Sequence, residues 1–84
     1  MYSVSITNRA ERDLKKLNRQ IKNRVTKCIL ALASDPRPSG CLKVQSEEGV
    51  WRVRVGDWRI AYTVDDASQE IVVIRIAHRS EFYS

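Results

Sequence analysis

Three arginines fall close together in a stretch whose pattern predicts a two-stranded hairpin. Arg52 and Arg54 alternate with apolar residues over residues 51–55, the period-two pattern of a half-buried strand. Gly56-Asp57 then provides a two-residue loop of the type II′ kind. Counting outward from this loop places Arg54 opposite Arg59, on the same face as Arg52. Like charges opposite one another destabilise a sheet, so an RNA phosphate backbone would relieve their repulsion. The simpler alternative is that the arginines only solvate an outer face.

A second group of chemically able residues follows the last predicted strand. His78 is the only histidine, Arg79 follows it, and Tyr83 comes a turn later. We expect this tail to reach the arginine face of the hairpin. Arginines bind phosphate oxygens in a bidentate way, and histidine titrates nearest neutral pH. This set suits cleavage of RNA by its own 2′-hydroxyl, which needs neither metal nor cofactor. On its own, His78 would more simply be a surface residue that ends a strand.

Size and charge agree with an anionic partner. The 84 residues carry a formal net charge of +5 and predict a single domain, residues 1–84. The first 43 residues hold 10 Lys and Arg against 3 Asp and Glu, whereas the remaining 41 hold 5 against 7. Lys22 and Lys27 are further candidates for contact with RNA, although charged helix faces are usually just solvated. The sequence has no glycine-rich phosphate loop and no Ser/His/Asp set.

The sequence predicts a cytoplasmic protein whose two cysteines are reduced. No apolar run approaches the length of a membrane span. Polar residues interrupt the N-terminal stretch, which is unlike a signal peptide. We therefore expect no membrane association and a cytoplasmic protein. Cys28 and Cys41 show neither metal-ligand spacing nor a CxxC motif, so both are expected as reduced thiols and no metal site is expected.

Two helices are expected to support these residues. The first is predicted over residues 9–17, with Thr7 or Asn8 as its N-cap. The second is predicted over residues 19–33, after the cap Asn18. Its apolar residues form one continuous stripe, which indicates that one side of the helix is buried.

Four strands are expected beside them. Apolar and polar residues alternate over residues 2–6, which predicts the first strand. Residues 42–44 begin an extended segment that leads to the hairpin. Residues 71–77 are apolar nearly throughout, which predicts a central strand buried on both faces. The tail is expected to form a loop or a single turn. The resulting class is α+β, in the order β-α-α-β-β-β. An antiparallel helix hairpin would cover one face of a small, mostly antiparallel four-stranded sheet and leave the arginine face open.

Two stretches of the sequence resemble the RelE branch of the RelE/ParE toxin superfamily. Residues 52–62 read RVRVGDWRIAY, and residues 74–83 read IRIAHRSEFY. The element order and the length also agree, so the resemblance covers essentially the whole chain. It implies an mRNA interferase, a metal-independent endoribonuclease that is the toxin of a type II toxin–antitoxin pair. Such toxins enter the ribosomal A site and cut the mRNA there. The implied partners are therefore the ribosome, mRNA and a RelB-like antitoxin that blocks the site.

The resemblance assigns six residues to catalysis, namely Arg52, Arg54, Arg59, His78, Arg79 and Tyr83. The first three match the basic residues of the hairpin, which also bind RNA, and the last three match the residues after the last strand. Some family members have lysines where this chain has Arg52 and Arg54. Lysine can lose its proton, whereas arginine in practice cannot. Proton transfer is therefore expected from His78, Tyr83 or the ribosome.

Two other functions stay open from the sequence. A ParE-like inhibitor of DNA gyrase belongs to the same superfamily and needs no RNA-cleaving residues, so the joint presence of the six residues speaks against it. A non-catalytic RNA-binding module of the same fold also stays open, because the lysines of some family members are missing here.

Overall fold

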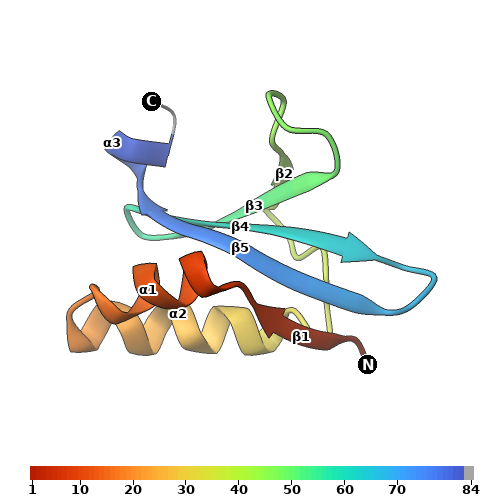
Figure 1. Ribbon diagram of the computed structural model, residues 1–84, viewed down its shortest axis with the longest axis horizontal. Coiled ribbons are helices and arrows are strands. Elements are labelled where there is room, and N and C mark those ends of the chain that lie inside the picture. Colours follow the sequence, from red (N-terminus) through yellow and green to blue (C-terminus); the bar gives the residue numbers. More distant parts are fainter. Residues whose placement is uncertain (83–84) are drawn as a thin grey trace.

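The structure, a computed structural model, describes residues 1–82 as a five-stranded sheet with helices on both sides (Figure 1). In chain order the elements are β1 (Ser3–Ile6), α1 (Asn8–Lys15), α2 (Arg19–Ala31), β2 (Leu42–Lys43), β3 (Val50–Val55), β4 (Trp58–Asp65), β5 (Glu70–His78) and α3 (Arg79–Phe82). The strand order is β1-β5-β4-β3-β2. β1 runs parallel to β5, and the other neighbours are antiparallel.

The predicted α+β class is confirmed, and the strand count differs by one. The additional strand, β2, is two residues long and pairs with β3 through Leu42 opposite Arg52 and Lys43 opposite Trp51. A strand this short shows no alternation in the sequence, because period two needs several residues to become visible. The predicted tail turn is present as α3, which lies on the side of the sheet away from α1 and α2 (Figure 1).

Side-chain caps fix where the two long helices begin. The Thr7 hydroxyl accepts a hydrogen bond from the backbone N–H of Ala10 at 3.1 Å, so Thr7 rather than Asn8 is the N-cap of α1. Asn18 caps α2 as predicted, by accepting from the N–H of Ile21 at 3.0 Å. Both helices end two residues before their predicted ends.

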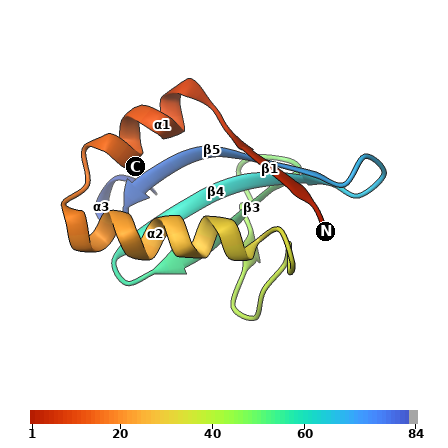
Figure 2. The ribbon, with the colours of Figure 1, turned by 90° about the horizontal axis from the view of Figure 1, so that it is seen from below.

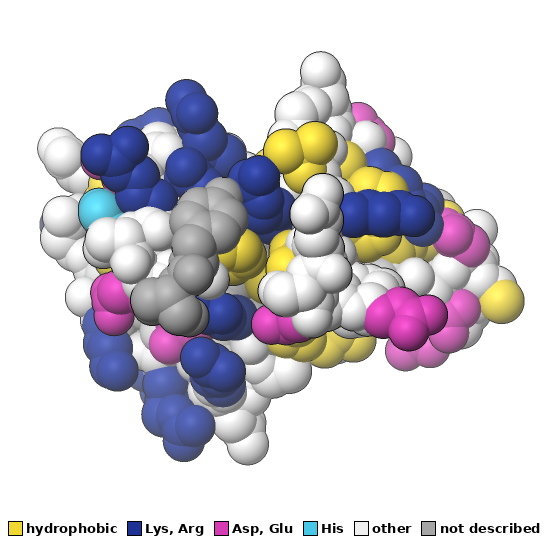
Figure 3. All heavy atoms as spheres, turned by 90° about the horizontal axis from the view of Figure 1, so that it is seen from above, with side chains coloured by type: hydrophobic (Ala, Val, Ile, Leu, Met, Phe, Trp, Pro, Cys, Tyr) yellow, Lys and Arg dark blue, Asp and Glu magenta, His cyan; other side chains and the backbone are white. Residues whose placement is uncertain are grey.

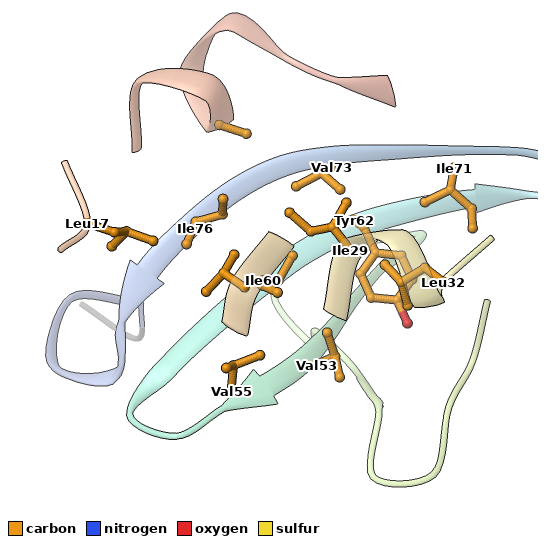
Figure 4. Packing of buried hydrophobic residues seen from close by; sticks show 12 residues of the cluster. Leu17, Ile29, Leu32, Val53, Val55, Ile60, Tyr62, Ile71, Val73 and Ile76 are labelled. Atoms are coloured by element: carbon orange, nitrogen blue, oxygen red, sulfur yellow. The ribbon is translucent and has the colours of Figure 1, made fainter. Parts of the chain in front are cut away.

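The core lies between the sheet and the helices α1 and α2 (Figure 4). Figure 2 shows both helices lying across this face of the sheet. The buried side chains labelled in Figure 4 are Leu17, Ile29, Leu32, Val53, Val55, Ile60, Tyr62, Ile71, Val73 and Ile76. Burial of each contributes about 1.5–3 kcal/mol. Trp51 is only half-buried and lies beneath two cations, with the Arg37 Cζ at 5.2 Å and the Lys43 Nζ at 5.5 Å from its ring centroid.

The prediction that the last strand is buried on both faces is wrong. β5 is an interior strand, but Val72 and Ile74, which face away from α1 and α2, are only half-buried. The apolar run therefore reflects one fully buried face and one partly covered face. It does not reflect two layers of helices.

Candidate functional site

The hairpin of β3 and β4 has the predicted register. Arg54 lies opposite Arg59, and Arg52 lies opposite Ala61. Gly56, the first residue of the loop, has a φ of 58°, a value that glycine adopts without strain. Directly opposite residues share a face, so the three arginines lie on the face away from α1 and α2. We call this face of the sheet the open face. Figure 3 shows Lys and Arg side chains gathered toward one end of it.

The three arginines differ in exposure. Arg54 is exposed, Arg52 is half-buried, and Arg59 is buried with 8% of its surface exposed. The Nη1 of Arg59 donates to the carbonyl oxygens of Gly56 and Trp58, at 3.1 Å each. The expectation that Arg59 would stand on an exposed face is therefore wrong, because the carbonyl groups beside the turn bind its guanidinium.

A bulge in β5 decides which of its residues reach the open face. Tyr62 lies opposite Val73, but its neighbour Ala61 lies opposite Arg75, so Ile74 is an inserted residue. Beyond the insertion the alternation of the two faces is reversed. Without it, Arg75 would lie opposite Ile60 and point into the core.

Contacts from α1 and from its N-cap Thr7 hold this bulge. The N–H of Thr7 donates to the carbonyl oxygen of Val73 at 3.0 Å, and its hydroxyl donates to that of Ile74 at 3.3 Å. The N–H of Ile76 donates to the Oδ2 of Asp13 at 3.1 Å. Three hydrogen bonds therefore fix the backbone on both sides of the inserted residue.

Arg75 is the site residue that sequence reasoning missed. It lies beside Ala61 on the open face, and its Nη2 donates to the carbonyl oxygens of Glu81 at 3.0 Å and Phe82 at 3.3 Å. Its Cζ lies 4.9 Å from the centroid of the Phe82 ring. Arg75 thus fastens α3 to the open face. An arginine inside an apolar strand was the available signal, because a charged side chain is rarely left facing a core.

His78 lies at the end of the sheet, on the face of Trp58. The two residues are cross-strand partners, and their ring centroids are 5.4 Å apart with the planes at 89°. The expectation that His78 joins the arginines on the open face is wrong, because the bulge reverses the faces. The N–H of Ser80 donates to Nδ1 at 3.2 Å. The neutral ring therefore carries its hydrogen on Nε2.

The remaining tail residues tie α3 to the hairpin turn. The N–H of Arg79 donates to the carbonyl oxygen of Asp57 at 2.8 Å, and the two side chains form an exposed ion pair at 3.9 Å. Exposed pairs of this kind contribute little, so the backbone bond is the firmer link. Tyr83, predicted to be catalytic, lies outside the described residues.

The two lysines predicted to bind RNA do not lie on the same face of the sheet as the arginines. Lys22 and Lys27 are exposed on α2, which covers the opposite side of the sheet (Figure 2). A different cation of the same helix comes nearest the turn. The Nη1 of Arg24 lies 3.5 Å from where a side chain at Gly56 would begin.

The described residues offer few other chemical groups. Within residues 1–82 no three His, Cys, Asp or Glu side chains are grouped so that they could hold a metal ion. In the same part of the chain, no helix is long and apolar enough to cross a membrane. Cys28 and Cys41 are free thiols, and burial raises the pKa of Cys28.

The sequence is similar to known toxins. The family model described as the ParE toxin of the type II toxin–antitoxin system matches residues 4–83. Toxin RelE of Mycobacterium tuberculosis (strain ATCC 25618 / H37Rv) is 34% identical over 83 residues, covering 98% of this chain and 86% of that protein.

Solved structures agree with these matches. A chain of the toxin–antitoxin complex RelBE2 from Mycobacterium tuberculosis is 31% identical with a TM-score of 0.81, covering 93% of this chain and 98% of that one. A chain of the archaeal RelE-RelB complex from Pyrococcus horikoshii OT3 has a TM-score of 0.83 at 22% identity, covering 95% and 97%, and so shares the fold.

Proposed function

This chain belongs to the family of ParE toxins of type II toxin–antitoxin systems and is RelE-like, and from that premise we propose that it cleaves mRNA in the ribosomal A site. The observation that carries the proposal is a group of four arginines, on three adjacent strands, that share the open face: Arg52, Arg54, Arg59 and Arg75. Neighbouring strands lie about 4.8 Å apart, so these residues lie within about 10 Å across the sheet. Such a group suits an RNA phosphate backbone.

The proposed reaction uses the substrate's own nucleophile. The 2′-hydroxyl oxygen attacks the adjacent phosphorus and loses its proton, the bond from phosphorus to the 5′-oxygen breaks, and the 5′-oxygen gains a proton. The products are a 2′,3′-cyclic phosphate and a 5′-hydroxyl. We assign Arg52 and Arg54 to the phosphate, where guanidinium groups stabilise the charge that develops on its oxygens. Arg59 and Arg79 hold the turn beside them.

Proton transfer is assigned to His78, with Tyr83 as the second candidate. Arginine keeps its proton, so the arginines cannot serve in this step. When the His78 ring is protonated, it can give its Nε2 proton to the leaving 5′-oxygen and become neutral. When the ring is protonated, Nδ1 can donate to the Ser80 Oγ, which lies 2.9 Å away. Both protonation states of the ring therefore have a partner, as an acid–base group requires.

The proposed partners are a RelB-like antitoxin, the ribosome and mRNA, met in the cytoplasm. Support for the antitoxin comes from the solved relatives, which are toxin–antitoxin complexes. Lys22 and Lys27, on the side of the sheet away from the arginines, are assigned to ribosomal RNA and not to the cleaved strand.

One observation favours a second function. The matching family model is named for ParE, so inhibition of DNA gyrase is the alternative. A further alternative is a catalytically weak RNA-binding module, because Arg52 and Arg54 can bind RNA but cannot transfer protons.

Primer extension on a defined mRNA in a purified translation system tests the proposal. We expect cuts only at the A-site codon and only with ribosomes. Arg54→Ala is the informative variant because Arg54 is exposed, and we expect it to lower the cleavage rate about 100-fold. Lys15→Ala is the charge-matched control, since Lys15 is an exposed residue of α1. Translation arrest without cuts would overturn the proposal, and a DNA supercoiling assay would then test the gyrase alternative.

A further inference from the structure

A hollow of about 640 Å³ opens beside Arg52 on the open face. It is lined by residues 42–46, by Arg52 and by Phe82 of α3. Figure 3 shows hydrophobic side chains exposed on this face next to the Lys and Arg side chains. The volume is that of a pocket for one small organic group or nucleotide.

One wall of the hollow is apolar. Leu42, the cross-strand partner of Arg52, keeps 52% of its surface exposed. Val44 packs against a small cluster on the open face, formed by Val50, Ala61 and Phe82. This wall is separate from the main core and adjoins the arginines. Apolar surface left exposed at the edge of a cationic face marks a binding site for a ligand with both apolar and anionic parts.

The backbone around the hollow is held before any ligand arrives. The N–H of Val44 donates to the carbonyl oxygen of Val50 at 2.8 Å. Two further hydrogen bonds close the loop, from Glu47 to Val44 at 3.2 Å and from Val50 to Glu47 at 3.3 Å. A wall fixed in this way costs little ordering entropy when a ligand binds.

We propose that this hollow binds a nucleobase of single-stranded RNA, next to a phosphate held by Arg52, an inference that rests on the proposed function. A nucleobase is the flat and least hydrated part of RNA, and it would cover Leu42 and Val44. Arg52 supplies the charge that an adjoining phosphate requires. The exposed amide of Gln45 and hydroxyl of Ser46 lie at the same hollow and can hydrogen-bond a base edge. The site would therefore give the enzyme a preference among codons.

The test is an NMR titration of the ¹⁵N-labelled protein with a 2′-O-methylated RNA trinucleotide, which cannot be cleaved. The matched probe is the same trinucleotide with its central base removed. We expect the amide signals of residues 42–46 to shift with the intact probe only, and the Arg54 signal to shift with both. Equal shifts of residues 42–46 with the two probes would overturn the proposal.

Leu42→Ser is the informative variant and Leu30→Ser is its control. Leu30 is an exposed leucine of α2, with 66% of its surface accessible, and it is outside the hollow. We expect Leu42→Ser to weaken binding of the intact probe about fivefold, and to leave binding of the abasic probe unchanged. Equal affinities of the two variants for the intact probe would contradict a base in the hollow.

Cleavage and base binding can fail separately. If the wild type arrests translation without cutting mRNA but residues 42–46 respond to the base, the endoribonuclease proposal fails and the base site stands. If the wild type cuts, and Leu42→Ser cuts the same codons at the same rates with no base-dependent shift, the base site fails alone.

Discussion

Trp58 and His78 lie opposite each other at the ends of β4 and β5, and the two rings meet edge to face at 5.4 Å. This contact and the hydrogen bond from Ser80 hold the imidazole from two sides. His78 is therefore held in a fixed orientation at the end of the sheet, on the face of Trp58 and not on that of the arginines. A catalytic histidine needs such fixed orientation, because proton transfer depends on the geometry between donor and acceptor.

His78→Asn separates the two roles of this residue. Asparagine is a good N-cap, so its side-chain oxygen can still accept the N–H of Ser80 at the start of α3. We expect the melting temperature to stay close to that of the wild type and mRNA cleavage to fall by about 100-fold or more. Primer extension and thermal melting on the same preparation measure both. Wild-type cleavage by His78→Asn would show that the imidazole is only a cap.

Arg59→Ala is expected to lower stability, in contrast to Arg54→Ala. Arg59 is buried and donates to two carbonyl oxygens beside the turn, and hydrogen bonds of charged groups contribute about 1.5–3 kcal/mol each. We expect a loss of about 3 kcal/mol in the free energy of unfolding by urea. Arg54 is exposed, so its replacement should change that free energy by less than about 0.5 kcal/mol. Equal unfolding midpoints of the two variants would contradict this assignment.

Tyr62→Phe is expected to change the stability at alkaline pH. The buried Tyr62 hydroxyl donates to the carbonyl oxygen of Pro36 at 2.8 Å, and burial, followed by the nearby thiol of Cys41, raises its pKa above the ordinary 10.0. The folded state thus holds this proton more tightly than the unfolded state. The stabilisation is complete below pH 10 and is lost as the pH rises from there toward the folded-state pKa.

At neutral pH, the lost hydrogen bond should make Tyr62→Phe less stable by about 1 kcal/mol. Above pH 10 the gap between wild type and variant should narrow, as measured by urea unfolding at several pH values. A gap that stays constant up to alkaline unfolding would contradict the raised pKa.

Asp13→Ala tests the contact that holds the bulge. The variant leaves the N–H of Ile76 without its carboxylate acceptor, and such a loss costs about 1–3 kcal/mol in a partly buried site. Because the bulge places Arg75 beneath α3, we also expect faster amide exchange in residues 79–82. Glu11→Ala, a carboxylate of the same helix that forms an exposed ion pair, is the control. Equal rates of amide exchange in α3 of the two variants would show that the bulge does not stabilise α3.

The sequence alone was sufficient for the hairpin and for the start of α2. Gly56 fixes a two-residue loop, and the loop length fixes the register, so Arg52, Arg54 and Arg59 had to share a face. The N-cap of α2, Asn18, could likewise be predicted from the sequence, because capping depends only on neighbouring residues. These features follow from local geometry and from the period of the side chains.

Only the tertiary structure decided what β5 contributes to the site. The bulge at Ile74 is held by hydrogen bonds that Thr7 donates and Asp13 accepts, and both residues are more than 60 residues away along the chain. It places Arg75 on the open face and His78 beside Trp58, the reverse of what simple alternation predicts. Similarly, the Arg59 side chain was found bound to turn carbonyls and not exposed. Strand periodicity predicts the face of a residue only while the strand is regular. The position of a bulge is determined by contacts with residues that are distant in the sequence.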